Sequence, residues 1–438
     1  MALQMQLTYK KYLKTSLPPL LSTVSCSLIG AVDTAVVGHL GSYHYINAVS
    51  LGAVIFSTVY WLFGFLKIST SGFAAQAFGT HNPKEISYAF LRSVFAAFCI
   101  GIILVALQKP IYSFALYIFN PEQATEILLA NYYNILIWIM PLTLVFQTAQ
   151  GWFAGTLHVK IFVLTGVSTN VLNLILDLIF VIGLHLDVTG VAGASCIANI
   201  CGFAATIYFY RLHQPLPLSN LSLQEMFHGP SFHQMLQCGT HLTIRMLCMI
   251  LMVNSFLHQS SVFGGILLTA NSILFQIQFI MGDILTGLSQ AAAIYSGIAF
   301  GERNRKLLND VLKISFVSAI SVGGLESISY YILRQPILSC FTDLKAVLAT
   351  AKEYDFFIAF YPFISSLGIV YYGLFNGALF TMPICISMLG TAACYLLAYF
   401  TLIPIYGNAG LWTSFLIFYV ARTSLLLLFV PSLKRHFP

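Results

Sequence analysis

The sequence predicts an all-α polytopic membrane protein, with about twelve transmembrane helices in two six-helix lobes. Apolar residues make up 58% of the 438-residue chain and charged residues 8%, whereas a soluble domain carries about 25% charged residues. The apolar runs are long enough to cross a bilayer as helices, which takes about 20 residues. Barrel strands would be about ten residues long and would alternate in polarity, so the runs favour helices.

The predicted spans follow one another with short polar connections. In chain order they cover residues 15–41, 46–78, 87–117, 124–156, 159–184, 188–211, 232–259, 265–300, 307–335, 345–379, 382–404 and 408–433. Several exceed the length needed to cross, so we expect tilted or protruding helices. A polar, proline-containing linker at residues 213–231 separates an N-terminal lobe, residues 1–212, from a C-terminal lobe, residues 232–438.

Basic residues are distributed unevenly around these spans. If the spans alternate, most of them fall on one side, namely Lys10, Lys11, Lys14, Lys84, Arg92, Lys160, Arg211, Arg303, Arg305, Lys306, Lys313, Lys434 and Arg435. Basic residues favour the cytoplasmic side, so we expect the linker and both termini in the cytoplasm, with the chain in a bacterial inner membrane. The net charge of +6 therefore reflects the orientation of the chain in the membrane, and we expect no nucleic-acid partner.

The two halves of the chain resemble each other at a nearly constant offset of 222 residues. At this offset the matches are Phe78-Gly79, Asn82 and Lys84 with Phe300-Gly301, Asn304 and Lys306, and Gly151, Phe153 and Gly155 with Gly373, Phe375 and Gly377. Later in the chain, Ala192-Gly193 matches Ala409-Gly410 at an offset of 217. An even number of spans in each half predicts a parallel repeat, with a cavity that can open alternately to either side.

Two acidic residues in the N-terminal half break this symmetry. Asp33 lies in the middle of the first span and Asp177 lies in the fifth, opposite Ser255 and Cys394 of the second half. A carboxylate at bilayer depth costs roughly 2.5–3.5 kcal/mol. A chain tolerates that cost where the carboxylate faces a wet cavity or carries a proton or a cation, so the pair indicates a cation-coupled site.

Further polar side chains share the N-terminal spans. Asn170, Asn173 and Asp177 fall on one face of the fifth span at i, i+3 and i+7. The fourth span carries Tyr132, Gln147 and Gln150, and the sixth carries Ser195 and Asn199. Together they would give the N-terminal lobe a polar interior. Hydrogen bonding between helices is the alternative interpretation for each of them.

Three other charged residues within spans have an uncertain role: Lys67, Arg245 and Asp283. A salt bridge, or a base that extends toward the membrane surface, would account for them. The chain has no nucleotide-binding motif and no metal-ligand spacing, so we expect no cofactor and no metal. His39 and His81 lack an acid partner of stated geometry, so we do not expect an enzyme such as an acyltransferase.

Several segments resemble the multidrug and toxic compound extrusion (MATE) family, and specifically its DinF-like branch. The resemblance covers nearly the whole chain and is carried by Leu17-Pro18, Val32-Asp33-Thr34-Ala35-Val36-Val37-Gly38-His39-Leu40-Gly41, Trp61-Leu62-Phe63-Gly64-Phe65-Leu66-Lys67, Ala74-Ala75-Gln76-Ala77-Phe78-Gly79, Asp283 and the spacing of Asn173 to Asp177. It implies twelve helices in two lobes and export of organic cations in exchange for H+ or Na+.

The resemblance also assigns roles to residues. It implies that Asp33, Asn173 and Asp177 line a cavity of the N-terminal lobe, with Tyr132, Gln150 and Ser195 at further cavity positions. It implies that the first helix bends at Pro18 on ion binding. The acidic C-lobe cation site of the NorM-like branch has no clear match here.

We therefore expect a monomeric secondary antiporter that exports cationic amphipathic compounds. Protons are the favoured coupling ion because one carboxylate suffices for a proton, although the oxygen ligands on offer do not exclude Na+. The alternative is a lipid-linked oligosaccharide flippase of the same superfamily, which should have a basic cavity and commonly two extra helices.

Overall fold

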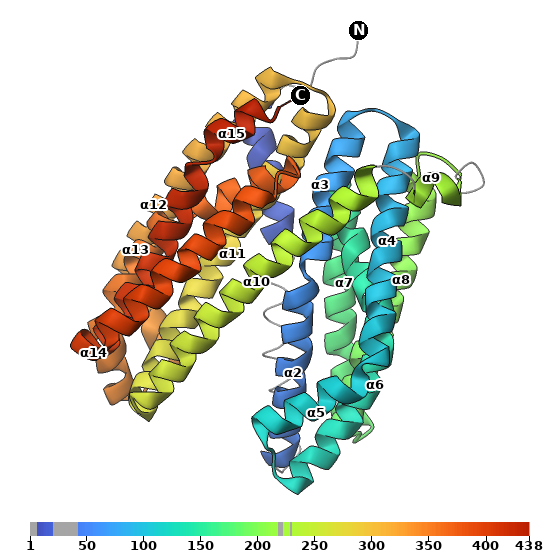
Figure 1. Ribbon diagram of the computed structural model, residues 1–438. Coiled ribbons are helices and arrows are strands. Elements are labelled where there is room, and N and C mark those ends of the chain that lie inside the picture. Colours follow the sequence, from blue (N-terminus) through green and yellow to red (C-terminus); the bar gives the residue numbers. More distant parts are fainter. Residues whose placement is uncertain (1–6, 21–42, 218–221, 228–229, 438) are drawn as a thin grey trace. The chain divides into compact units, whose positions relative to one another are not determined.

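The computed structural model describes residues 7–20, 43–217, 222–227 and 230–437, and every regular element among them is a helix (Figure 1). The described residues form two compact units. Residues 43–235 make the N-terminal unit, and residues 7–20 with 236–437 make the C-terminal unit. The division into lobes at residues 212 and 232 stays a prediction, but residues 7–20 group with the C-terminal unit by their contacts.

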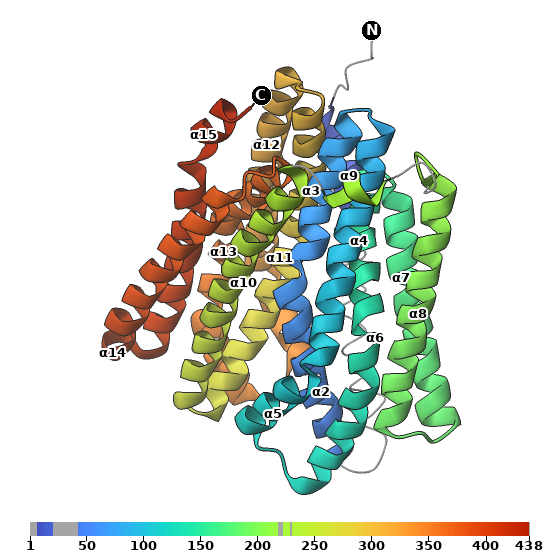
Figure 2. The same ribbon diagram turned by 45° about the vertical axis from the view of Figure 1, so that its right-hand side comes forward.

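The N-terminal unit is built around α6. Its helices are α2 (Tyr43–Phe63), α3 (Phe65–Gly79), α4 (Pro83–Ala106), α5 (Gln108–Phe119), α6 (Gln123–Gly155), α7 (Val159–Asp177), the π-helix η1 (Leu178–Gly183), α8 (Val188–His213) and α9 (Leu223–Phe227). α6 packs against α2, α3, α4, α7 and α8 (Figure 2). These bounds agree with the predicted spans two to six, apart from interruptions at Gly64, between α2 and α3, and at Leu107, between α4 and α5.

The interruption at Leu107 divides the third predicted span, where α4 ends and α5 begins. Pro110 follows three residues later, in the first turn of α5. A proline has no N–H to donate to the carbonyl four residues earlier, and its ring crowds that carbonyl. It is tolerated in the first turn of a new helix, so the chain restarts its helix there.

The C-terminal unit is built around α13. It holds residues 9–20, α10 (Pro230–Val262) from residue 236 onward, and the helices α11 (Gly265–Gly301), α12 (Arg305–Phe341), α13 (Lys345–Gly377), α14 (Met382–Leu427) and α15 (Val430–Arg435). α13 packs against α11, α12 and α14 (Figure 1). α14 breaks at Gly407, whose φ of 55° and ψ of −128° are not helical, and so comprises the eleventh and twelfth predicted spans.

Ten helical segments of the described chain are long and apolar enough to cross a membrane. One of them contains both halves of α14. The first predicted span continues beyond residue 20 into residues 21–42, which lie outside the described residues.

The internal repeat extends to matching packing contacts. A Cβ at Gly151 of α6 would collide with the carbonyl oxygen of Lys67 on α3, and a Cβ at Gly373 of α13 would collide with that of Ser289 on α11. Both residues of the second pair stand 222 positions after those of the first. Each central helix therefore uses glycine to approach its neighbour's backbone in the same place.

Connecting turns repeat as well. His81 and Arg303 both have positive φ, and so do Leu157 and Leu379, each pair 222 residues apart. Leu157 and Leu379 come just before α7 and α14. α7 is then helical up to Asp177, and α14 is helical over the corresponding residues, so neither helix gains or loses a residue relative to the other. The predicted match of Asp177 with Cys394 is therefore wrong, because the offset of 222 persists here and places Tyr399 opposite Asp177.

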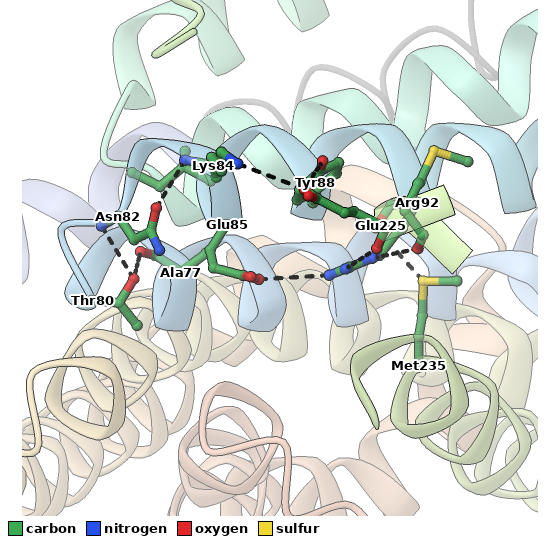
Figure 3. Close-up of polar contacts among 12 residues, drawn as sticks. Ala77, Thr80, Asn82, Lys84, Glu85, Tyr88, Arg92, Glu225 and Met235 are labelled. Atoms are coloured by element: carbon green, nitrogen blue, oxygen red, sulfur yellow. Dashed lines mark hydrogen bonds and ion pairs between the residues drawn. The ribbon is translucent and has the colours of Figure 1, made fainter. Parts of the chain in front are cut away.

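The short helix α9, inside the predicted linker, contacts α4 of the same unit (Figure 3). On α9, Glu225 accepts a hydrogen bond of 2.6 Å from the Tyr88 hydroxyl and lies 3.7 Å from Lys84 Nζ. Arg92 donates to the backbone carbonyls of Met226, at 2.8 Å, and Glu225, at 3.2 Å. The Tyr88 hydroxyl and the Lys84 charge lower the pKa of the Glu225 carboxyl. Polar contacts thus hold α9 on α4.

Candidate functional site

A cavity of about 440 Å³ lies inside the N-terminal unit. Its walls come from α2, α3, α6, α7 and α8. Of the predicted cavity side chains that the structure describes, all but Asp177 line this cavity: Tyr132, Gln147, Gln150, Asn170, Asn173, Ser195 and Asn199. The polar face of the fifth span and the polar positions of spans four and six therefore meet in one place.

Asn173 joins α7 to α8 at the cavity wall. Its amide donates a 3.3 Å hydrogen bond to Ser195 Oγ, and the Asn199 amide donates to the Ser195 backbone carbonyl at 2.8 Å. Gly202, further along α8, lets Thr169 of α7 approach closely, since a Cβ there would lie 2.5 Å from Thr169 Oγ1. This contact keeps the two polar faces adjacent, and the bond to Ser195 holds the amide of Asn173.

One side of the cavity is aromatic, and a close contact between α2 and α6 positions its Tyr132 ring. A Cβ at Gly52 of α2 would collide with the Tyr132 ring of α6, so only glycine lets the ring lie there. The Phe56 ring packs edge-on to Tyr132 at 6.3 Å between centroids. Flat or aromatic cations can pack against such rings through cation–π contact.

Lys67 is the charged side chain that sequence reasoning did not place in the cavity. It lies on α3, lines the cavity, donates to Gln150 Oε1 at 3.2 Å, and has its ammonium 4.7 Å from the centre of the Phe162 ring. Among the described lining residues it is the only charged one. A base therefore lies on the wall of the cavity in which the resemblance places the acids Asp33 and Asp177.

Asp177 is fully buried at the last residue of α7, directly before η1. It lies one helical turn beyond Asn173 and is absent from the cavity wall itself. π-Helical turns are rare and occur frequently at functional sites. Asp33, the other predicted coupling acid, lies outside the described residues.

The remaining predicted positions lie in the C-terminal unit. Pro18 falls within the helical residues 9–20. The Arg245 guanidinium of α10 lies over the Tyr372 ring of α13 at 4.1 Å, and Asp283 lies partly exposed on α11. The proposed bend at Pro18 and the roles of the two charges stay predictions.

The cavity wall offers neutral oxygens, aromatic faces and one ammonium group. Asparagine, glutamine, serine and threonine oxygens suit hard cations, and a buried carboxyl one turn away can take up a proton. No group of three metal-ligating side chains occurs among the described residues.

Comparisons with known proteins agree with this architecture. The MatE family model matches residues 18–179 and 242–401, more than half of the chain, so the protein belongs to this family of membrane transporters. DNA damage-inducible protein F of Escherichia coli (strain K12) is 28% identical over 408 residues, which cover 93% of this chain and 88% of that protein. The multidrug export protein MepA of Staphylococcus haemolyticus (strain JCSC1435) is 24% identical over 71% of this chain and 68% of its own.

Among solved structures, a MOP superfamily transporter from Pyrococcus furiosus superposes with a TM-score of 0.86 at 16% identity, covering 98% of this chain and 96% of that one. The Pyrococcus transporter is described as having a binding pocket of reverse polarity. The resemblance to the DinF-like branch and the predicted two-lobe, twelve-helix fold are confirmed by these similarities.

Proposed function

We propose that this transporter is a secondary antiporter that exports cationic amphipathic compounds, and that the N-terminal cavity holds them. The observation that carries the proposal is the cavity itself, where polar side chains from α6, α7 and α8 meet aromatic rings of α2 and α6. The name of the MepA relative, a multidrug export protein, supports the substrate class. The protein acts by transport, without catalysis, as a monomer in the bacterial inner membrane with both termini cytoplasmic.

Coupling to protons would use Asp33 and Asp177, with Na+ as the alternative ion. A buried carboxyl favours its neutral form, so it can carry a proton across and release it when the cavity opens to water. Binding of a cation to the ionised acids and binding of a proton would exclude each other, and the occupied state would select the cavity's orientation.

The second repeat supports placing Asp33 in the same site as Asn173. Their counterparts at the offset of 222 are Ser255 and Tyr395. The Ser255 and Tyr395 hydroxyls lie 3.0 Å apart in a hydrogen bond. The repeat therefore predicts that the first and fifth spans of the N-terminal half also meet at these positions.

Lys67 favours a second candidate function. A lysine on the cavity wall attracts phosphate or carboxylate groups and repels cations, which fits a flippase for a lipid-linked oligosaccharide. The two candidates differ in the sign of the ligand charge, so one substitution separates them. Lys67→Gln should improve or preserve transport of an organic cation and should abolish transport of a pyrophosphate-linked lipid.

Proteoliposomes loaded with a fluorescent organic cation test the proposal. We expect efflux when a pH gradient is imposed without Na+, and little efflux under a Na+ gradient at equal pH. Efflux driven by a Na+ gradient alone would show that Na+ is the coupling ion, and the antiporter proposal would stand. Absence of cation movement under both gradients, together with movement of a lipid-linked pyrophosphate, would reject the antiporter in favour of the flippase.

A further inference from the structure

We propose that a groove in the C-terminal unit binds an anionic phospholipid. The groove has a volume of about 480 Å³ and lies between residues 9–20 and the helices α11 and α12. Its walls are apolar apart from one end, and they are formed by Leu13, Leu17, Leu20, Ile284, Leu288 and Val322. Lys10, Lys14 and Ser16 complete the lining. A lipid would bind in this groove whichever substrate the N-terminal cavity carries.

The groove has a fixed shape because residues 9–20 are anchored on the C-terminal unit. The Tyr12 hydroxyl donates to the Leu288 carbonyl at 2.8 Å and accepts from Ser315 Oγ at 3.2 Å. The Thr15 and Tyr295 hydroxyls lie 2.8 Å apart in a hydrogen bond. These bonds are buried and cross between elements far apart in the sequence, so the wall carrying the lysines keeps its place beside α11.

A small residue brings that wall close. A Cβ at Gly287 of α11 would lie 2.9 Å from the Ser16 carbonyl oxygen and 3.2 Å from the Leu20 side chain. The close approach leaves Leu13 and Leu17, which are 45% and 54% exposed, along the open side of the groove. An apolar chain lying there would cover them.

Charge selects the occupant. Lys10 and Lys14 stand one helical turn apart, both exposed, and neither forms an ion pair with a described residue. The lining contains no carboxylate. Two ammonium groups at one end repel a cationic amphiphile, and a long apolar wall gives a free anion nothing to bind. A phospholipid fits both parts of the groove, because its phosphate can contact Lys10 and Lys14 while its acyl chain packs against the apolar wall.

The position of the two lysines in the chain is also consistent with lipid binding. Lys10 and Lys14 belong to the basic cluster that precedes the first predicted span, where the polar headgroups of a bilayer lie. Basic clusters next to a span attract anionic lipids. A bound lipid would bridge the start of the first span to α11 and α12, and would therefore stabilise that anchored arrangement.

Lipid binding to the full-length purified protein tests the proposal. Phosphatidylglycerol and phosphatidylcholine are titrated separately, and retained lipid is counted by native mass spectrometry. We expect phosphatidylglycerol to bind more tightly, and the double variant Lys10→Gln/Lys14→Gln to weaken its binding by roughly tenfold or more. Lys11→Gln is the matched control, because Lys11 is exposed on the same helix and does not line the groove.

A second variant tests the apolar end. Val322→Trp should fill the groove and displace the lipid while both lysines remain, whereas Leu325→Trp on an exposed part of α12 should not. Equal binding of the two lipids, an equal loss in Lys11→Gln, or displacement of the lipid by inorganic phosphate alone would each overturn the proposal. Monodisperse elution of each variant shows that it has folded.

Discussion

The N-terminal and C-terminal units share a packing scaffold and differ in what fills it. Where the N-terminal unit has a cavity lined by Ala53, Ser195 and Ala198, the C-terminal unit carries Phe275, Trp412 and Phe415 at the offsets of 222 and 217. These rings pack on one another and on Phe256, with Phe275 and Phe415 centroids 5.6 Å apart. Small side chains open the first unit and aromatic ones close the second.

Polar groups follow the same contrast. In the C-terminal unit the Asn271 amide donates to Asn408 Oδ1 at 2.7 Å and to Ser260 Oγ at 2.9 Å, and its oxygen accepts from Trp412 Nε1 at 2.9 Å. This network is internally satisfied and buried. The N-terminal unit instead directs Gln147, Gln150 and Asn170 into the cavity. The half of the repeat that lacks the two acids uses its polar groups in structural bonds.

The largest expected effect concerns the acids of the N-terminal half. Asp177→Asn, and independently Asp33→Asn, should fold and lose gradient-driven efflux, because an amide cannot exchange a proton at neutral pH. The counterpart Tyr399→Phe should retain efflux, since it removes only a hydroxyl that donates to Gln259. Efflux from proteoliposomes measures all three, and full efflux in both acid variants would remove the acids from the coupling site.

Removing a ring from the closed unit should cost stability. Phe415 is fully buried among aromatic side chains, so Phe415→Ala should destabilise the protein by about 3–5 kcal/mol. Thermal unfolding in detergent measures the loss. The control Phe400→Ala removes a ring that is 70% exposed. An equal loss of stability in this control would show that packing in the aromatic cluster does not stabilise the protein.

Asn173→Ala should weaken coupling by less than Asp177→Asn does. The amide bonds to Ser195 Oγ and carries no charge, so its loss leaves a proton acceptor in place but removes one oxygen ligand and one contact between α7 and α8. The dependence of efflux on pH should shift while efflux persists. A complete loss of transport, as in Asp177→Asn, would make Asn173 a direct participant.

The smallest expected effect lies at matching helix connections. His158 stacks near Trp152, with the His213 ring 4.9 Å away, while the C-terminal counterpart is a Phe380–His436 stack. Burial and the neighbouring His213 lower the pKa of His158. Its contribution to stability is therefore present above the ordinary imidazole pKa, near 6.5, and is lost as the pH falls toward its lowered value.

The variant His158→Phe should remove this acid sensitivity by making the first unit resemble the second. Melting temperatures between pH 7.5 and pH 5.5 should fall less in the variant than in the natural protein. Equal falls in both would assign the acid sensitivity to other groups.

Much of this contrast could be predicted from the sequence. Polar residues inside apolar spans are rare, so Tyr132, Gln150 and Asn173 stood out and do meet in one cavity. Lys67 was not predicted there, because a long side chain can extend from many positions and only packing against Gln150 and Phe162 fixes its direction. The aromatic side chains that fill the C-terminal unit could be predicted in part, because Phe275 stands 222 residues after Ala53 in the repeat.

Other features depend on tertiary contacts that no local pattern encodes. The anchoring of residues 9–20 on α11 requires Tyr12 to reach the Leu288 carbonyl, 276 residues away in sequence. The short helix α9 forms within a linker that reads as polar coil, and its contacts with Tyr88 and Arg92 of α4 hold it in place.

The central claim is that the open N-terminal cavity, and not its filled counterpart, carries the transported cation. Ala198→Phe gives the first unit the ring that the second unit has at Phe415, and Ala204→Phe on the exposed face of the same helix is the matched control. Binding of a fluorescent organic cation to purified protein should fall at least about tenfold in Ala198→Phe, the loss of roughly 1.4 kcal/mol, with Ala204→Phe unchanged. Unaltered binding in a folded Ala198→Phe protein would contradict the account.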